Sequence, residues 1–299
     1  MRRPRPLPPS LAFRAFSVND ARAAGVSRRR TRADDLAAPF HGVRTASQTP
    51  QSTAAFCAAY AARMSPDQFF SHGTAAELHQ FPIRARGAQL LHVSVAEPAH
   101  PPQARGVKGH RLAEGTAVVT RNGLRLVSAE VAWCQLAREL SHNELVVVGD
   151  FLVRRKRPLS SLAKLRAVVD ALGAVRGVRA MRRALEDVRA GTDSPMETRV
   201  RLLLVAGGLP EPVIHFAVRD ADGFFVATPD LAYVKERIAI EYEGEFHQTD
   251  RRVYAEDIAR REALGRAGWL VILVISDHLS RPQFVVRRVA TALRERAAL

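Results

Sequence analysis

The sequence of 299 residues predicts an α/β protein that is built from several domains. A chain of this length corresponds to roughly two domains at about 150 residues each, with three small ones as an alternative. Hydrophobic residues make up 47% of the chain, which is enough to fill cores and argues against wholesale disorder. Apolar residues recur with helical spacing in some stretches and alternate in others, so both helices and strands are expected.

The N-terminal segment predicts a basic arm followed by a small helical unit. Residues 1–10 hold three arginines among four prolines, and we interpret them as a disordered basic arm. In residues 11–50, Ser17 is a candidate N-cap for a helix that ends before Gly25, and Ser27 would begin a second helix that continues to about Leu36. A short strand over residues 40–43 would complete the outline of a winged helix-turn-helix.

Positive charge is concentrated in the same segment. The chain carries 45 Lys+Arg against 30 Asp+Glu, a net charge of +15, and residues 1–50 alone contribute ten arginines and three acids, or +7. Phosphate contacts need local positive charge, so DNA is the first candidate partner. The candidate nucleic-acid-binding residues of the predicted second helix are Arg28, Arg29, Arg30 and Arg32. The alternative is an arginine-rich helix face that is merely solvated.

The middle region, residues 51–190, predicts an α/β arrangement without a recognisable site. We expect a helix over residues 51–64, strands over 90–95 and 116–120 with a hairpin turn at Asn122-Gly123, and then four helices, over 129–140, 143–153, 160–172 and 178–188. Four histidines are scattered here without metal-ligand spacing, which favours structural or surface roles: His72, His92, His110 and His142. We assign this region no function.

Cysteine content and hydropathy indicate a cytoplasmic protein. The two cysteines, Cys57 and Cys134, form no CxxC or Cys/His cluster, so neither a zinc site nor a disulfide framework is expected. The basic N-terminus is not followed by the apolar core of a signal peptide. No apolar run reaches the roughly 20 residues of a membrane span, so we expect no membrane partner.

The C-terminal region, residues 191–299, predicts the element order α-β-β-β-α-β-α. Ser194, Pro195 and Glu197 have the spacing of a capping box at the start of a helix that ends at Gly207-Gly208. Strand-like runs follow over residues 213–218, 224–228 and 237–243. A helix over 250–267, an apolar strand over 269–275 and a final helix from residue 282 complete the order.

Three carboxylates of this region form a candidate catalytic site. Asp230 follows one predicted strand, and Glu241 and Glu243 lie two apart on the next, so these two point to one face while Ile238 and Ile240 point to the other, as in a half-buried strand. If the two strands pair as a hairpin, the acids converge. Three clustered carboxylates repel one another unless a cation lies between them, and oxygen ligands suit Mg²⁺ or Mn²⁺.

The Pro-Asp pair and the Glu-x-Glu pair on consecutive strands resemble the PD-(D/E)XK nuclease motif. The run Ile240-Glu241-Tyr242-Glu243-Gly244-Glu245-Phe246-His247, followed by Asp257-x-x-Arg260 and Gly268-Trp269, is similar to a bacterial family of unassigned function that is related to the very-short-patch mismatch-repair endonucleases. The resemblance covers about residues 190–299 and implies a restriction-endonuclease-like domain.

The resemblance also implies roles for individual residues. Asp230, Glu241 and the main-chain carbonyl of Tyr242 would hold a metal ion, Mg²⁺ or Mn²⁺, and Glu197 would support the site from the first helix. His247 would activate water or protonate a leaving group, and Arg260 would bind a phosphate or brace the carboxylates. The family's lysine is replaced by Glu243, which leaves water activation to Glu243 or His247 and leaves open a domain that binds without cleaving.

The stretch from Phe16-Ser17 to Val43-Arg44 contains an Ala-Ala-Gly-Val-Ser turn and a closing Gly-Val pair. With these features, residues 11–50 resemble, less specifically, the winged-helix start of AbiEi-type antitoxins, which are DNA-binding repressors in abortive-infection toxin–antitoxin pairs. The resemblance makes a cognate toxin a candidate partner. We therefore expect a metal-dependent endodeoxyribonuclease in DNA repair or phage defence, with a non-catalytic DNA-binding regulator as the alternative and RNA as a weaker substrate class. Double-strand cleavage would need two sites and hence a homodimer.

Overall fold

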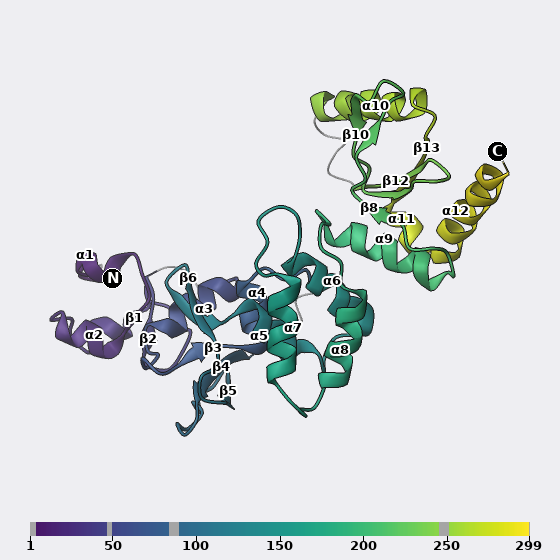
Figure 1. Cartoon of the computed structure of the whole chain (residues 1–299). Helices are drawn as coiled ribbons and strands as arrows, with labels where there is room; N and C mark the ends of the chain where they lie inside the picture. Colours follow the sequence, from purple (N-terminus) through teal and green to yellow (C-terminus); the bar gives the residue numbers. More distant parts are fainter. Residues whose placement is uncertain (1–3, 47–49, 84–89, 245–250, 299) are drawn as a thin grey trace. The chain divides into compact units, whose positions relative to one another are not determined.

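The chain is a mixed α/β protein with several small sheets, and the computed structural model describes residues 4–46, 50–83, 90–244 and 251–298 (Figure 1). It divides into two compact units, Met1–Glu139 and Leu140–Leu299, which are treated separately below. Within the described ranges, the helices are all too short or too polar to cross a membrane.

The first unit begins with short elements: α1 Pro9–Ala12, β1 Phe16–Ser17, α2 Val18–Ala23, a 3₁₀ turn Arg30–Arg32 and β2 Val43–Arg44. The N-cap predicted at Ser17 is confirmed, because its hydroxyl accepts from the Asp20 N–H and the Asp20 carboxylate accepts in return from the Ser17 N–H. β1 and β2 pair antiparallel and hold this segment together. Residues 4–10 are not a free arm throughout, since Leu7 packs on the small core of Leu11 and Phe16.

The predicted second helix is wrong, because only the 3₁₀ turn Arg30–Arg32 forms where an α-helix from Ser27 to Leu36 was expected. The Ser27 hydroxyl does accept from the Arg30 N–H, at 3.2 Å, as an N-cap would. The Arg30 guanidinium, however, donates twice to the Asp35 carboxylate, at 2.9 and 2.8 Å, and to the Arg5 carbonyl. The ion pair with Asp35 and the bond to the Arg5 carbonyl hold this segment as a compact loop in place of the expected helix.

The rest of the first unit is a five-stranded sheet with helices. The strands have the order β5-β4-β3-β7-β6, and β4 pairs parallel to β5 and antiparallel to β3. The element bounds are α3 Thr53–Ala61, β3 Phe69–Phe70, α4 His72–Leu78, β4 Leu91–Ala96, β5 Val107–Leu112, β6 Val118–Arg121, β7 Leu124–Val127 and α5 Ala129–Leu136. The predicted hairpin turn forms between β6 and β7, with φ of 49° at Asn122 and 75° at Gly123.

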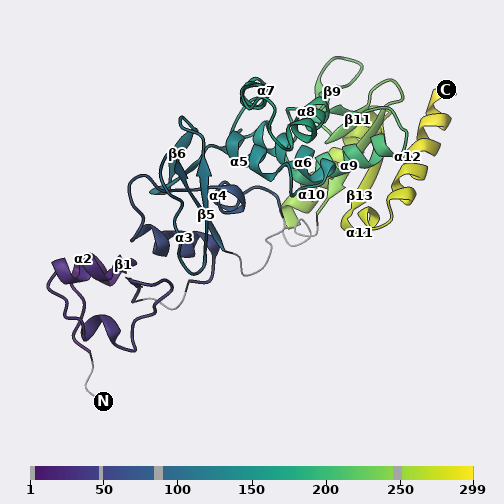
Figure 2. The ribbon, with the colours of Figure 1, turned by 90° about the horizontal axis from the view of Figure 1, so that it is seen from below.

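The second unit begins with three helices: α6 His142–Leu152, α7 Leu162–Ala171 and α8 Val178–Asp187, which pack beside one another (Figure 2). Helix α6 also packs on α9 Pro195–Ala206. A buried polar cluster joins them, since Arg201 of α9 donates to the Asp150 carboxylate of α6 at 2.9 Å, and so does the Thr198 hydroxyl. The compact unit therefore includes α6–α8 with the C-terminal elements, whereas the sequence places a domain boundary at residue 191.

The C-terminal elements form three layers. The central sheet has the order β13-β12-β11-β8, with α10 on one face and α9 and α12 on the other (Figure 1). The bounds are β8 Val213–Ile214, β9 Val218–Arg219, β10 Phe225–Ala227, β11 Leu231–Tyr233, β12 Ile238–Glu243, α10 Arg251–Arg266, β13 Leu270–Ile275, α11 Ser276–Leu279 and α12 Pro282–Ala297.

Two strand predictions need correction. The run over residues 213–218 divides into β8 and β9, which belong to different sheets, because the chain turns at His215 with φ of 49°. The strand β12 is also buried on both faces rather than one. Ile238 and Ile240 face α9 and α12, while Ala239 packs with Leu264 of α10.

Candidate functional site

The hairpin of β11 and β12 brings Asp230 next to Glu241. The two strands pair antiparallel with Leu231 opposite Ile240, so the residue before β11 lies beside the residue after Ile240. The predicted hairpin partner, residues 224–228, forms β10 in the separate two-stranded sheet instead. The two acids nevertheless converge, because β11 follows Asp230 directly.

Glu197 and His215 complete the inner part of this cluster. The Ser194 hydroxyl accepts from the Glu197 N–H at 3.2 Å and caps α9 as predicted. The Glu197 carboxylate does not return to the Ser194 N–H in a capping box; it accepts from the Asp193 N–H and contacts His215 Nε2, both at 2.9 Å. The side chain of Glu197 is only 6% exposed, so α9 presents this carboxylate inward.

Asp230 is fixed in place and electrostatically perturbed. Its Oδ2 accepts from the N–H of Tyr242 at 2.8 Å, which orients the carboxylate toward β12. Burial, followed by repulsion from Glu197, raises the pKa of Asp230 to about 6, and Glu241 adds to this repulsion. The hydrogen bond from the Tyr242 N–H and the nearby His215 lower the pKa of Asp230, but they do not cancel the increase.

Two arginines of α10 bind the carboxylates of β12. Arg260 donates to Glu241 at 2.7 Å, and Arg261 donates to Glu243 at 3.0 Å while its Nε lies 3.6 Å from Glu241. Burial raises the pKa of Glu241, and the two arginines oppose that shift. Arg260 also bonds to Asp257 of its own helix at 3.2 Å. The structure therefore places Arg260 as a brace for the carboxylates.

These side chains surround a cavity of about 330 Å³. Its lining is Ser194, Met196, Glu197, Asp230, Glu241, Tyr242, Glu243, Gly244, Asp257, Arg260 and Arg261. Glu241 Oε2 is buried and, within the described part of the chain, forms no hydrogen bond. The cavity thus combines four acids and two arginines from α9, β12 and α10 with Asp230.

One group in this region could hold a metal ion: Glu197, His215 and Asp230 each offer a ligand atom, and these atoms all lie within 4.8 Å of one another. The pair of carboxylates and one imidazole suits a divalent cation. Sequence reasoning missed His215, which lies 15 residues before Asp230 and belongs to no motif. It reaches the site because its backbone N–H donates to the Asp230 carbonyl at 3.1 Å.

Two predicted site residues need separate comment. His247 lies outside the described residues, and its role stays a prediction. Tyr242 lines the cavity, and its N–H donates to Asp230; metal binding by its carbonyl also stays a prediction.

The predicted DNA-binding arginines of the first unit separate into two groups. Arg28 and Arg32 line a hollow of about 1080 Å³ beside α2 and β2. Three further arginines border the same hollow: Arg22, Arg44 and Arg63. Arg30 is instead bound to Asp35, and Arg29 is exposed outside the lining.

The structure also brings together three of the four histidines that the sequence leaves scattered. His72, His92 and His110 form a cluster in the first unit. His142 belongs to the second unit, where it begins α6 and its Nε2 lies 2.8 Å from Asp187 Oδ2. No local spacing signals the cluster, since its members are 20 and 18 residues apart.

Comparison with known proteins gives relatives without an established activity. No family model matches the chain. Two proteins of Mycobacterium tuberculosis, "Uncharacterized protein MT2308" of strain CDC 1551 / Oshkosh and "Uncharacterized protein Rv2248" of strain ATCC 25618 / H37Rv, are each 28% identical to it over 189 residues. The match covers 60% of this chain and 68% of each relative.

Proposed function

We propose that this chain is a DNA-binding, divalent-metal-dependent endonuclease-like protein that hydrolyses phosphodiester bonds. The observation that carries the proposal is the meeting of Glu197, Asp230 and Glu241 at one cavity, from three elements of a three-layer α/β unit. This arrangement agrees with the resemblance of the Pro-Asp and Glu-x-Glu pairs to the PD-(D/E)XK motif. DNA repair or phage defence is the context that the resemblance suggests.

The donor set fits a hard divalent cation such as Mg²⁺ or Mn²⁺. Glu197 and Glu241 are buried, and the pKa of Asp230 is raised by burial first and then by repulsion from Glu197. His215 adds an imidazole to Glu197 and Asp230. An ion held by these residues would polarise a scissile phosphate and lower the pKa of an attacking water.

The surrounding residues would orient the acids and the substrate. The Tyr242 N–H holds Asp230, and Arg260 and Arg261 hold Glu241 and Glu243. Arginine binds phosphate oxygens as readily as carboxylates, so Arg261 would exchange part of its contact with Glu243 for a DNA phosphate. Glu243 would then be free to accept a proton from water in place of the missing lysine.

The direct test is cleavage of supercoiled plasmid with Mg²⁺ or Mn²⁺ by the full chain. Asp230→Asn and Glu241→Gln should each lower the rate by at least roughly a hundredfold, because a lost metal ligand costs several kcal/mol of transition-state stabilisation. Glu262→Gln is a matched control, since this carboxylate of α10 is 65% exposed and outside the cavity lining. Unchanged cleavage by both site variants would refute the assignment.

The second candidate function is a DNA-binding regulator without catalysis. Two observations favour it: Glu243 stands where the family has lysine, and Glu241 is already paired with Arg260 in the absence of substrate. The arginine-lined hollow of the first unit would then carry the activity by binding DNA phosphates. Tight duplex binding with no turnover under any divalent ion would favour this function over the first.

A further inference from the structure

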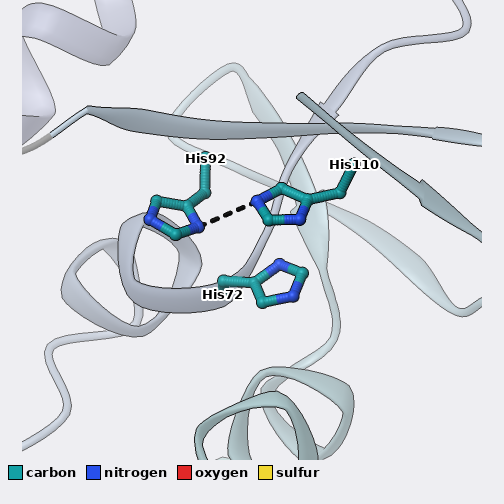
Figure 3. A group of neighbouring side chains, drawn as sticks. All are labelled: His72, His92 and His110. Atoms are coloured by element: carbon teal, nitrogen blue, oxygen red, sulfur yellow. Dashed lines mark hydrogen bonds between the residues drawn. The ribbon is translucent and has the colours of Figure 1, made fainter. Parts of the chain in front are cut away.

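Three histidine side chains gather at one place in the first unit, far from any motif of the sequence (Figure 3). His110 Nε2 lies 3.0 Å from His92 Nδ1, and the rings of His72 and His110 stack with their centroids 3.9 Å apart. Each ring offers one nitrogen, and these three nitrogens all lie within 4.8 Å of one another. The rings therefore share one small space.

The fold holds these three histidines on adjacent elements. His92 is on β4 and His110 on β5, and the parallel pairing sets His110 opposite Ser94, two residues beyond His92 on the same face. His72 begins α4 immediately after β3 and has φ of 49°, a conformation that residues other than glycine rarely adopt. Such a strained backbone conformation persists only where contacts with the surrounding structure hold it in place.

Hydrogen bonds from neighbouring elements fix that strained residue. The His72 N–H donates to the Gln135 side chain of α5 at 2.6 Å, and the N–H of His92 donates to the Thr74 hydroxyl of α4 at 2.8 Å. The second bond ties α4 to β4 directly. Both histidines are thus held in position by hydrogen bonds of their main chains.

We infer that His72, His92 and His110 form a binding site for a divalent transition-metal ion of the Zn²⁺ class, with one coordination position left open. Three imidazoles and no carboxylate suit Zn²⁺ and its first-row neighbours rather than Mg²⁺ or Ca²⁺. With bonds of about 2.0–2.1 Å, tetrahedral nitrogens lie about 3.3 Å apart. Binding of one ion would therefore draw the three nitrogens closer together and turn the His72 ring out of its stack on His110.

A second layer of polar groups supports this assignment. Ser71 Oγ lies 2.9 Å from His72 Nδ1, and it accepts a hydrogen bond from the Ser94 hydroxyl at 2.6 Å. Metal-binding histidines commonly donate their other ring N–H to such an oxygen, which sets the tautomer and the ring orientation. Bonded in this way, His72 would present Nε2 to the ion. Both serines are fully buried, which keeps this oxygen in place.

The histidines are also poised to bind as neutral ligands. Burial is the largest cause that lowers the pKa of His72 to about 3 and that of His110 to about 4, and it lowers the pKa of His92 as well. Unprotonated imidazole is the form that ligates metal, so an ion would not have to displace protons at neutral pH.

The test uses the full chain, stripped of metal and without a polyhistidine tag. Zn²⁺ affinity is measured by competition with a chromogenic chelator, and Co²⁺ is added as a spectroscopic probe whose visible absorption is intense only at low coordination number. The second unit has its own candidate metal group, so all measurements are repeated in Asp230→Asn. We expect Asp230→Asn to keep one Zn²⁺ site of undiminished affinity and to give the same intense Co²⁺ bands as wild type.

The decisive comparison is His92→Gln/His110→Gln against His100→Gln, an exposed histidine of the same unit. The double variant should lose the Co²⁺ bands and bind Zn²⁺ at least roughly a hundredfold more weakly, while the control keeps both. Equal binding by the double variant and wild type would overturn the inference. If the double variant does not fold, Asp230→Asn decides, because the absence of intense Co²⁺ bands in that variant also overturns the inference.

Discussion

Asp230 combines a functional position with an electrostatic cost. In the folded chain its pKa is raised from 3.8 to about 6, chiefly by burial. Between these two pH values the folded state binds more protons than the unfolded state, so the free energy of unfolding falls as pH rises through this window. Above pH 6 the full cost remains, and it amounts to about 3 kcal/mol.

Asp230→Asn should therefore stabilise the metal-free protein while it abolishes cleavage. Asparagine keeps an oxygen that can accept from the Tyr242 N–H and carries no charge. We expect a gain of about 3 kcal/mol at pH 7.5 that disappears near pH 4, measured by urea unfolding in the presence of EDTA. Asp222→Asn, in an exposed turn, should show no such pH-dependent gain. A loss of stability in Asp230→Asn at pH 7.5 would contradict this account.

At the residue scale, sequence spacing predicts part of the candidate site. Asp230, Glu241 and Glu243 are identifiable because Asp230 follows one predicted strand and the other two lie two residues apart on the next, although the strand that pairs with β12 is β11 and not residues 224–228. His215 is not identifiable, because it enters through a turn of positive φ and a bond to the Asp230 carbonyl. The same holds for His72, His92 and His110, whose meeting depends on strand order rather than on local spacing.

The buried contact between α6 and α9 should matter for the stability of the second unit. Arg201 and Asp150 are 1% and 0% exposed, and Arg201 also donates to Glu211 at 2.6 Å. Arg201→Met leaves the Asp150 carboxylate buried without its cation, which costs about 3–5 kcal/mol. Urea unfolding at pH 7 measures this loss.

The matched variant for this pair removes both charges. In Asp150→Asn/Arg201→Met no buried charge is left without a partner, so the double variant should recover a large part of the loss. Equal destabilisation in the single and double variants would mean that packing of Arg201, and not its charge, stabilises this contact.

Two helical glycines of the same unit should respond oppositely to alanine. A Cβ at Gly149 of α6 would lie 2.4 Å from Cγ2 of Val188, whereas a Cβ at Gly265 of α10 would meet nothing within 4 Å. Gly149→Ala should destabilise by about 1–3 kcal/mol through overpacking, and Gly265→Ala should stabilise by up to about 1 kcal/mol through helix propensity. Thermal unfolding of both variants checks this, and a shift of the same sign in both would refute it.

At the element scale, the sequence predicts those caps and turns that are stabilised by hydrogen bonds or dihedral preferences of neighbouring residues. The caps at Ser17 and Ser194 and the turn at Asn122-Gly123 form as expected, because their hydrogen bonds or dihedral preferences lie within four residues. The helix expected from Ser27 does not form, because Arg30 bonds to Asp35 and Arg5. The three-residue strand β11 was too short to give a periodic signal.

On the scale of the whole molecule, charge is unevenly divided between the two compact units. The first unit has 19 basic and nine acidic residues, or +10, and the second has 26 and 21, or +5. Within the second unit, arginines near the candidate site are paired with acids, as Arg260 and Arg261 are with Glu241 and Glu243. The surplus of positive charge is therefore greater in the first unit, where arginines line the hollow beside α2.

This distribution predicts that the first unit supplies most of the salt-dependent affinity for DNA. Each lost phosphate contact lowers the slope of log Kobs against log salt by about 1, so Arg28→Ser should lower it by about 1 and Arg28→Ser/Arg32→Ser by about 2. Arg29→Ser removes the same charge from an exposed residue outside the hollow and should change the slope less. Fluorescence anisotropy with a labelled duplex at several salt concentrations measures all four proteins. Equal changes of the slope for Arg28→Ser and Arg29→Ser would show that DNA affinity depends on the overall charge of the segment and not on arginines that line the hollow.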